Sequence, residues 1–169
     1  MDTFISKSEQ DTINFAKDFA KNLKTGDIIV LTGDLGSGKT KFTQGILEYF
    51  GLGNEISSPT FTIVNEHHSK DVNIYHFDVY RLEDIDEFYA IGGEDYFENG
   101  ISIIEWGEII EDILPKGYIK ITFSKDENNE DYRELKIEWN WKYSVPLFFN
   151  MKIIVTLKHG IEKIILLLL

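Results

Sequence analysis

An eight-residue stretch between an apolar run and a helical pattern restricts the fold of this chain more than any other feature. It reads Gly-Asp-Leu-Gly-Ser-Gly-Lys-Thr at residues 33–40 and matches the pattern G-x-x-x-x-G-K-[ST] in full. The apolar run at residues 28–31 is too short for a helix and predicts a strand buried on both faces. After the stretch, apolar residues recur at helical spacing until Gly51, namely Phe42, Ile46, Leu47 and Phe50. We therefore expect a loop that joins a buried strand to a helix beginning at Lys39.

This loop has the composition of a phosphate-binding site. Glycines let the backbone curl so that successive N–H groups point into one concavity, and the N-terminus of the following helix adds partial positive charge. Lys39 can reach the β- and γ-phosphates of a nucleotide, and the Thr40 hydroxyl can ligate Mg²⁺. The residues expected at the phosphates are Asp34, Leu35, Gly36, Ser37, Gly38, Lys39, Thr40 and Lys41. The alternative, a flexible glycine loop with no ligand, is disfavoured because all four fixed positions match in the right context.

Two apolar runs end in an acid that could serve the same site. Residues 101–104 lead into Glu105, and residues 74–77 lead into Asp78. Adjacent parallel strands place their carboxyl ends along one edge of a sheet, where the loop also lies. One acid can then ligate Mg²⁺ while the other orients a water molecule or the γ-phosphate. For either acid alone, an ordinary solvated strand end is the competing interpretation.

A Ser-Pro-Thr-Phe segment, formed by Ser58, Pro59, Thr60 and Phe61, follows the predicted helix. Such a segment can fold over the γ-phosphate and Mg²⁺ as a switch, although Ser-Pro-Thr by itself indicates only a turn. The histidines at positions 67, 68 and 76 lack partners at metal-ligand spacing, so structural or exposed roles are favoured over a metal site. Arg81 is either an arginine finger in cis or a salt-bridge partner of the acids around it.

The remaining pattern predicts a mixed, mainly parallel sheet flanked by helices, the α/β class typical of nucleotide-binding proteins. A short strand at residues 3–5 precedes a helix with a capping box at Ser6 and Glu9. Strands are expected at residues 61–64 and 74–80, joined by a polar loop, and short helices at residues 84–89 and 108–114. Alternating apolar residues at 119–123 and 135–139 predict a C-terminal antiparallel hairpin. Residues 1–142 form the predicted domain, and residues 143–169 are an apolar tail to which no function is assigned.

Composition excludes several classes of function. The chain of 169 residues has room for one domain and has no cysteine, so disulfides, thiolate metal sites and a cysteine nucleophile are absent. The formal net charge of −12 repels polyanions, so stable direct binding to nucleic acid is not expected. No signal segment opens the chain and charged residues interrupt the apolar tail, so we expect a cytoplasmic protein without a membrane span.

Four motifs in this order resemble one family, that of TsaE. They are residues 33–40, the segment at residues 58–62, the run Tyr-His-Phe-Asp-Val-Tyr-Arg-Leu at residues 75–82, and Ile-Glu-Trp at residues 104–106. The resemblance covers about residues 3–139, and Lys41 departs from it by standing where relatives often have threonine. It implies a P-loop ATPase, weak alone, that uses ATP and Mg²⁺ beside a TsaB–TsaD complex in the threonylcarbamoyl modification of an adenosine next to the tRNA anticodon.

The same resemblance implies roles for individual residues. Thr40 and Glu105 would coordinate Mg²⁺, Asp78 would lie at the phosphates, and Glu9 and Arg133 would lie near the nucleotide. With Lys39, the two acids make up the expected catalytic set. The segment at residues 58–61 and the side chains of Tyr80, Arg81 and Trp106 would face the partner.

Two other classes of function use the same loop. A small-molecule or nucleoside kinase commonly places several arginines on the transferred phosphate, and this chain has only Arg81 and Arg133. A nucleotide-dependent assembly scaffold without turnover needs the same residues as a slow ATPase, so the sequence leaves it open. A GTPase is excluded, because no Asn-Lys-x-Asp run for guanine occurs.

Overall fold

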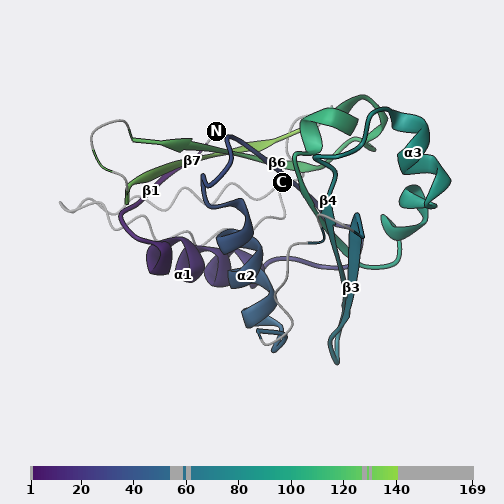
Figure 1. Ribbon diagram of the computed structural model, residues 1–169. Coiled ribbons are helices and arrows are strands. Elements are labelled where there is room, and N and C mark those ends of the chain that lie inside the picture. The colour runs from purple at the N-terminus through teal and green to yellow at the C-terminus, as the bar shows by residue number, and fades with distance from the viewer. Residues whose placement is uncertain (1, 54–58, 60–61, 127–128, 130, 141–169) are drawn as a thin grey trace, which may run out of the picture.

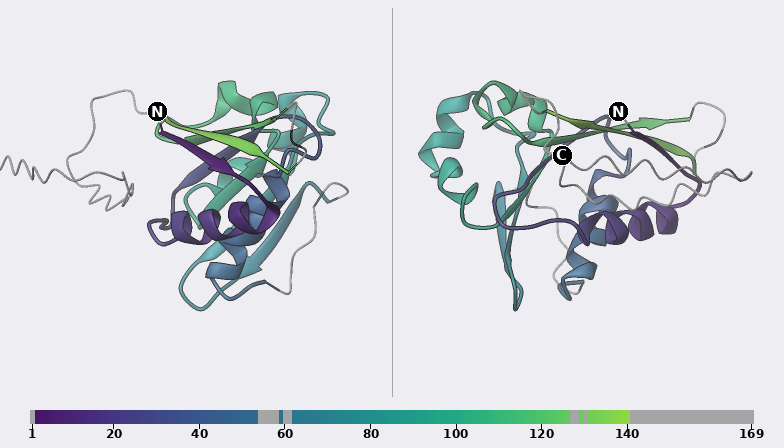
Figure 2. Two further views of the ribbon diagram at one scale, coloured as in Figure 1. Left: turned by 90° about the vertical axis from the view of Figure 1, so that its left-hand side faces the viewer. Right: turned by 180° about the vertical axis from the view of Figure 1, so that it is seen from behind.

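The computed structural model describes residues 2–53, 59, 62–126, 129 and 131–140. One seven-stranded sheet runs through them (Figure 1), and α1 and α2 lie together against one side of it (Figure 2). The strands are β1 Asp2–Ser6, β2 Ile28–Thr32, β3 Val64–His68, β4 Asn73–Asp78, β5 Ile101–Glu105, β6 Ile119–Lys125 and β7 Arg133–Trp139. The α-helices are α1 Glu9–Ala20, α2 Lys39–Tyr49 and α3 Ile85–Ala90, and the 3₁₀ helices are η1 Gly93–Tyr96 and η2 Gly107–Ile113.

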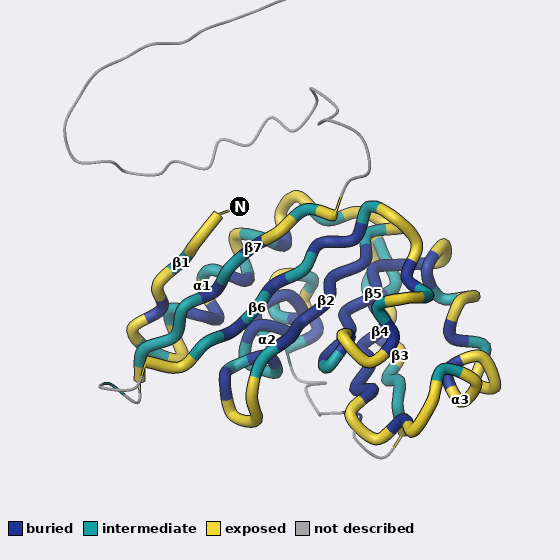
Figure 3. Tube along the Cα trace, turned by 90° about the horizontal axis from the view of Figure 1, so that it is seen from above, coloured by how far each residue is buried: buried dark blue, intermediate teal, exposed yellow. Residues whose placement is uncertain are grey.

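The strand order is β1-β7-β6-β2-β5-β4-β3. The four central strands, β6, β2, β5 and β4, pair in parallel, and the three outer pairings are antiparallel. β2 and β5 are buried along their whole length, as expected for strands covered on both faces (Figure 3). The predicted α/β class, the mixed sheet with flanking helices and the terminal hairpin of β6 and β7 are confirmed.

Alternate residues of β2 divide the core into two halves. Ile29 and Leu31 point toward α1 and α2, where Phe42 is fully buried. Ile28 and Val30 point to the other face, where they pack with Phe88 of α3 and other apolar residues of the segment that carries η1 and η2. The sheet is therefore held between two apolar layers, and its carboxyl edge stays open for the loops.

Three local predictions were wrong. The strand expected at residues 61–64 begins at Val64 instead, and it occupies the stretch assigned to a polar loop. The helix expected at residues 108–114 is the 3₁₀ helix η2, which starts one residue earlier after a left-handed Trp106. The N-cap of α1 is Ser8, not Ser6: the Ser8 hydroxyl accepts the amide of Asp11 at 3.1 Å, whereas Ser6 is buried against Thr12.

The last strand ends at Trp139, close to the predicted domain boundary. The tail of residues 143–169 lies outside the described residues. Within the described part of the chain, no helix is both long and apolar enough to cross a membrane.

Candidate nucleotide site

The glycine-rich loop and both strand-end acids meet at the carboxyl edge of the parallel strands. In the sheet register Asp78 lies opposite Glu105, and Glu105 lies opposite Leu31, just before the loop. A cavity of about 460 Å³ opens here. It is lined by Ser8, Glu9, Thr12, Leu35, Gly36, Ser37, Gly38, Lys39, Thr40, Lys41, Asp78, Glu105, Trp106, Asp131 and Arg133. The topology therefore brings together side chains from five separate parts of the sequence.

The loop depends on glycine at its turns. Gly33 has a φ of 126°, and a Cβ placed there would lie 2.3 Å from the carbonyl oxygen of Phe123, so no other residue fits without displacing β6. Gly38 is the N-cap of α2 and has no side chain to offer the first-turn amides. A helix N-terminus left in this way favours an anion.

Lys39 is held inside the site. Its Nζ donates to the carbonyl oxygens of Gly33 at 2.5 Å and Asp34 at 3.0 Å, and it lies 3.7 Å from the centroid of the Trp106 ring. Burial lowers the pKa of Lys39 below its ordinary value, against the opposing effect of nearby carboxylates, of which Glu105 acts most strongly. The ammonium group therefore lies inside the site, where it can bind an anion without first moving in from the solvent.

Glu105 is nearly inaccessible and its carboxylate is bound on both oxygens. The Thr40 hydroxyl donates to Oε2 at 3.0 Å, and the ring Nε2 of His76 lies 2.9 Å from Oε1. The Thr43 hydroxyl makes a longer contact of 3.4 Å with Oε1. His76 is buried, as its structural interpretation required, but its contact with Glu105 was not predicted. The signal was available, because His76 precedes Asp78 by two residues in β4 and must share its face.

Asp78 and Trp106 occupy the neighbouring wall. Asp78 is buried and accepts the backbone N–H of Tyr80 at 3.2 Å. The Trp106 ring contacts both the Lys39 ammonium and the exposed ring of Tyr80, whose centroid is 4.8 Å away. An aromatic pair, of which Tyr80 is exposed and Trp106 is partly buried, thus adjoins the cavity.

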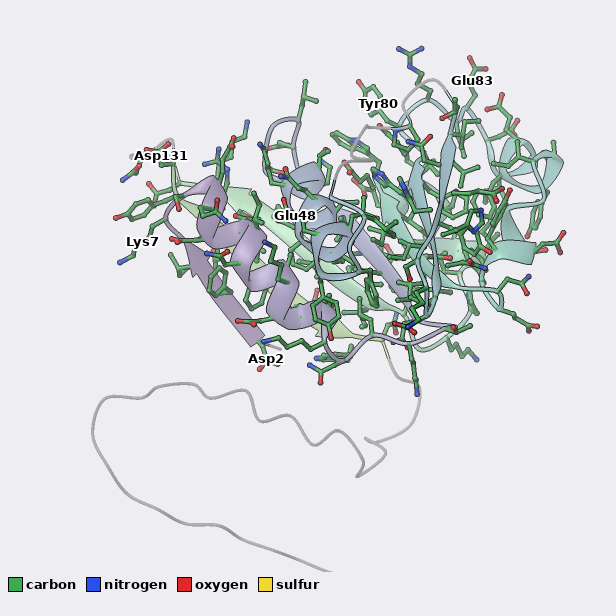
Figure 4. All side chains as sticks on the ribbon, turned by 90° about the horizontal axis from the view of Figure 1, so that it is seen from below. Asp2, Lys7, Glu48, Tyr80, Glu83 and Asp131 are labelled. Carbon is green, nitrogen blue, oxygen red and sulfur yellow. The ribbon has the colours of Figure 1, made fainter. Side chains whose placement is uncertain are left out.

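The opposite wall comes from the start of α1 and of β7. Lys41 forms an ion pair of 2.9 Å with Glu9, and Arg133 donates to the carbonyl of Tyr132 at 2.8 Å. Figure 4 shows Asp131 and Tyr80 at the same edge of the molecule, on either side of α2. The sequence placed Glu9, Lys41 and Arg133 at the site and missed Ser8, Thr12 and Asp131.

The structure does not bring every expected residue into the cavity. Arg81 is exposed in the turn after β4 and does not line it. Pro59 is buried and accepts the amides of Thr62 and Ile63. Ser58, Thr60 and Phe61 lie outside the described residues, so the switch interpretation stays a prediction.

The donor chemistry fits magnesium. Mg²⁺ prefers oxygen ligands and is usually bound by one or two carboxylates together with substrate phosphates and water. The Thr40 hydroxyl and the Glu105 carboxylate, already in contact, supply such oxygens beside the loop. Across the residues that the structure describes, no group of three or more His, Cys, Asp or Glu side chains forms a metal cluster. A magnesium site of this kind does not need such a cluster, because the phosphates of a bound nucleotide and water supply the other ligands.

The fold and the site together define an α/β protein whose glycine-rich loop and two buried acids meet at the carboxyl edge of a parallel sheet. The family model described as "Threonylcarbamoyl adenosine biosynthesis protein TsaE" matches residues 6–135. The chain belongs to the TsaE family.

Curated relatives and a solved structure agree with this assignment. The chain is 41% identical over 132 residues to the tRNA threonylcarbamoyladenosine biosynthesis protein TsaE of Rickettsia typhi, an alignment covering 78% of this chain and 92% of the relative. The protein of the same name from Bacillus subtilis is 39% identical over 122 residues, covering 72% and 76%. The crystal structure of YdiB from Bacillus subtilis superposes with a TM-score of 0.65 at 32% identity, covering 82% of this chain and 84% of that one.

Proposed function

We propose that this chain is a magnesium-dependent ATPase that acts in the biosynthesis of threonylcarbamoyladenosine in tRNA as an accessory to a TsaB–TsaD complex. Its family and the names of its relatives support the pathway. The observation that carries the ATPase proposal is the position of Thr40 and Glu105, joined by a 3.0 Å hydrogen bond directly beside the glycine-rich loop.

Each residue has a task that follows from its place. The loop amides and the start of α2 bind the phosphates, and Lys39 exchanges the carbonyls of Gly33 and Asp34 for the β- and γ-phosphates. Thr40 and Glu105 would hold Mg²⁺, which when bound neutralises charge on the phosphates. Asp78, on the same edge, orients the attacking water or the γ-phosphate. The side of the cavity formed by the start of α1 and of β7, with Glu9 and Arg133, binds the rest of the nucleotide.

The partner surface is proposed to be the aromatic pair of Tyr80 and Trp106 next to the cavity, with the exposed Tyr80 as its outer member. Tyr80 is 59% exposed, and Trp106, which its ring contacts, also contacts the Lys39 ammonium. A partner that covers Tyr80 would press on the group that binds the phosphates. This arrangement supports turnover that depends on the partner.

Hydrolysis of Mg-ATP with and without TsaB and TsaD tests the proposal, using wild type, Lys39→Ala and Glu105→Ala. The partners are expected to raise the wild-type rate, and Glu105→Ala is expected to remove magnesium-dependent turnover. Hydrolysis indifferent to the partners would contradict the accessory role. Phosphate transferred to an added nucleoside or sugar would favour a kinase, and partner assembly on ATP without hydrolysis would favour a scaffold.

Lys39→Ala is expected to weaken nucleotide binding by roughly tenfold to a hundredfold, because a hydrogen bond between charged groups contributes about 1.5–3 kcal/mol. Titration of a fluorescent ATP analogue measures this affinity. Lys21→Ala is the matched control, since Lys21 is exposed at the end of α1 and pairs only with Asp18 among the contacts described. Equal affinities for Lys39→Ala and wild type would show that the glycine-rich loop does not bind the nucleotide.

A further inference from the structure

A buried histidine outside the expected set of site residues contacts the acid assigned to magnesium. His76 is 1% exposed and Glu105 is 3% exposed, and the two side chains are 2.9 Å apart from Nε2 to Oε1. They come from neighbouring parallel strands, β4 and β5, and both point toward α2. A carboxylate buried this deeply is costly unless hydrogen-bond donors compensate it.

The contacts of the carboxylate divide between its two oxygens. His76 binds Oε1, whereas Thr40, the other residue assigned to magnesium, binds Oε2. Thr43 also reaches Oε1, but its hydroxyl lies 3.4 Å away and is shared with the carbonyl of Lys39 at 3.3 Å. His76 therefore makes the shortest contact that fixes the rotation of the carboxylate and keeps Oε2 turned toward Thr40.

The other ring nitrogen indicates which proton makes this bond. Nδ1 of His76 is buried and has no hydrogen-bond partner in the described structure. A proton on Nδ1 would be left without an acceptor, which is costly, whereas a proton on Nε2 is used by Glu105. The ring is therefore oriented to donate from Nε2 to one oxygen of the Glu105 carboxylate.

We infer that His76 is a positioning residue for magnesium, which orients the Glu105 carboxylate so that Oε2 and the Thr40 hydroxyl face the metal together. The inference rests on the proposed function, because it concerns the same magnesium site. Hydrogen-bond partners of metal ligands generally contribute about tenfold to a hundredfold to metal affinity or activity. Loss of His76 should therefore raise the magnesium requirement of nucleotide binding and leave the binding of metal-free nucleotide unchanged.

The test measures the affinity of a fluorescent ATP analogue in EDTA and at rising Mg²⁺ for wild type, His76→Ala, His76→Gln and His67→Ala. We expect His76→Ala to raise the half-maximal Mg²⁺ concentration about tenfold or more. His76→Gln should restore most of the loss, since its amide can donate to Oε1. His67→Ala is the matched control: His67 is 4% exposed on the adjacent β3 and does not line the cavity.

An unchanged midpoint in His76→Ala, or an equal shift in His67→Ala, overturns the inference while the proposed function stands. A wild type that binds no magnesium nucleotide overturns the proposed function and the inference with it. Nitrogen-15 NMR of the imidazoles gives a second measurement that needs no change at His76. We expect the His76 proton on Nε2, with its signal displaced in Glu105→Gln, and a ring protonated only on Nδ1 would overturn the inference.

Discussion

Lys39 already has partners inside the site, and it would have to exchange some of them for a phosphate when a triphosphate binds. Its ammonium group is shared between the carbonyls of Gly33 and Asp34 and the face of Trp106. These partners keep a buried cation hydrogen-bonded in the nucleotide-free protein, where an uncompensated charge would be costly. A phosphate oxygen offers Lys39 a charged acceptor in exchange for neutral ones, and such hydrogen bonds are stronger.

The lowered pKa of Lys39 leads to a prediction about pH. Burial lowers this pKa, so in the free protein the ammonium loses its proton below the ordinary lysine value of 10.5. As pH rises through that lowered pKa, the native state gains stability relative to the unfolded chain, which is still protonated. Nucleotide binding has the opposite dependence, because the phosphates require the charged form. The affinity for Mg-ATP should therefore fall as pH rises through the lowered pKa, which lies below the ordinary lysine value of 10.5.

Binding titrations across this range check the prediction, with Lys39→Arg as the control. Arginine stays charged throughout, so this variant should show a flat profile even where its affinity is lower. The charged groups that face Lys39 are the carboxylates of Glu105, Glu108, Asp78 and Asp34, and all four oppose the effect of burial on its pKa. A parallel decline in wild type and Lys39→Arg would show that another group titrates.

The sequence predicted the side of the cavity formed by the glycine-rich loop and the ends of β4 and β5. It missed parts of the side formed by the start of α1 and of β7, for a physical reason. Lys39 and Thr40 belong to one local pattern, and Glu105 and Asp78 end apolar strands, so short-range rules located all four. Ser8, Thr12 and Asp131 reach the cavity because β1 pairs with β7 and β7 with β6. The sequence does not contain that strand order in any local signal. Glu9 and Arg133 were placed by family resemblance alone.

Among the strands, β2 has a local sequence signal that identifies it, whereas β3 has none. β2 is a fully buried apolar run, and hydrophobicity alone identified it. β3 has the sequence Val-Asn-Glu-His-His, which is mostly polar and half exposed, and among the described strands it lies at the edge and pairs only with β4. Its backbone pairing, not its side chains, makes it a strand, so a composition-based prediction assigned it to a loop.

The packing of α1 on α2 has its own determinant, Gly45. A Cβ at this position would lie 2.4 Å from the carbonyl oxygen of Ile13 and 2.6 Å from the Cβ of Ala16. The two helices can approach this closely only because the side chain is absent. This contact orders the helix that begins at the glycine-rich loop, and so it connects the core to the site.

Gly45→Ala is therefore expected to destabilise the protein, although alanine in a helix interior normally stabilises by about 0.5–1 kcal/mol over glycine. Forcing the helices apart should cost about 1–3 kcal/mol, or a fall of several degrees in Tm by thermal unfolding. Gln44→Ala, at the adjacent half-buried position, introduces alanine into α2 without the clash and removes only the side-chain hydrogen bond that Gln44 donates to Glu48 among the contacts described. A Tm above that of wild type for Gly45→Ala would refute the close packing.

For the molecule as a whole, charge is distributed very unevenly. Residues 82–115 contain no lysine or arginine and eleven acids, which are Glu83, Asp84, Asp86, Glu87, Glu94, Asp95, Glu98, Glu105, Glu108, Glu111 and Asp112. This segment includes α3, η1, β5 and η2, so one side of the sheet has a strongly acidic cover. The net charge of −12 therefore arises mainly from one region, while the loop that we propose binds phosphates retains Lys39 and Lys41.

Such a distribution predicts that salt stabilises the fold. Like charges repel across the acidic cover, and this repulsion opposes the compact state. The Debye length falls from about 30 Å at 0.01 M to about 3 Å at 1 M salt, which screens the exposed carboxylates from one another. Tm should rise by a few degrees as NaCl is raised through this range.

Glu98→Lys, a charge reversal at an exposed position, should raise the free energy of unfolding by up to about 0.5 kcal/mol at low salt and lose this gain at high salt. Lys24→Glu, an exposed reversal of the opposite sign, should do the reverse, and a Tm that falls with salt in wild type would show that attractive ion pairs outweigh the repulsion.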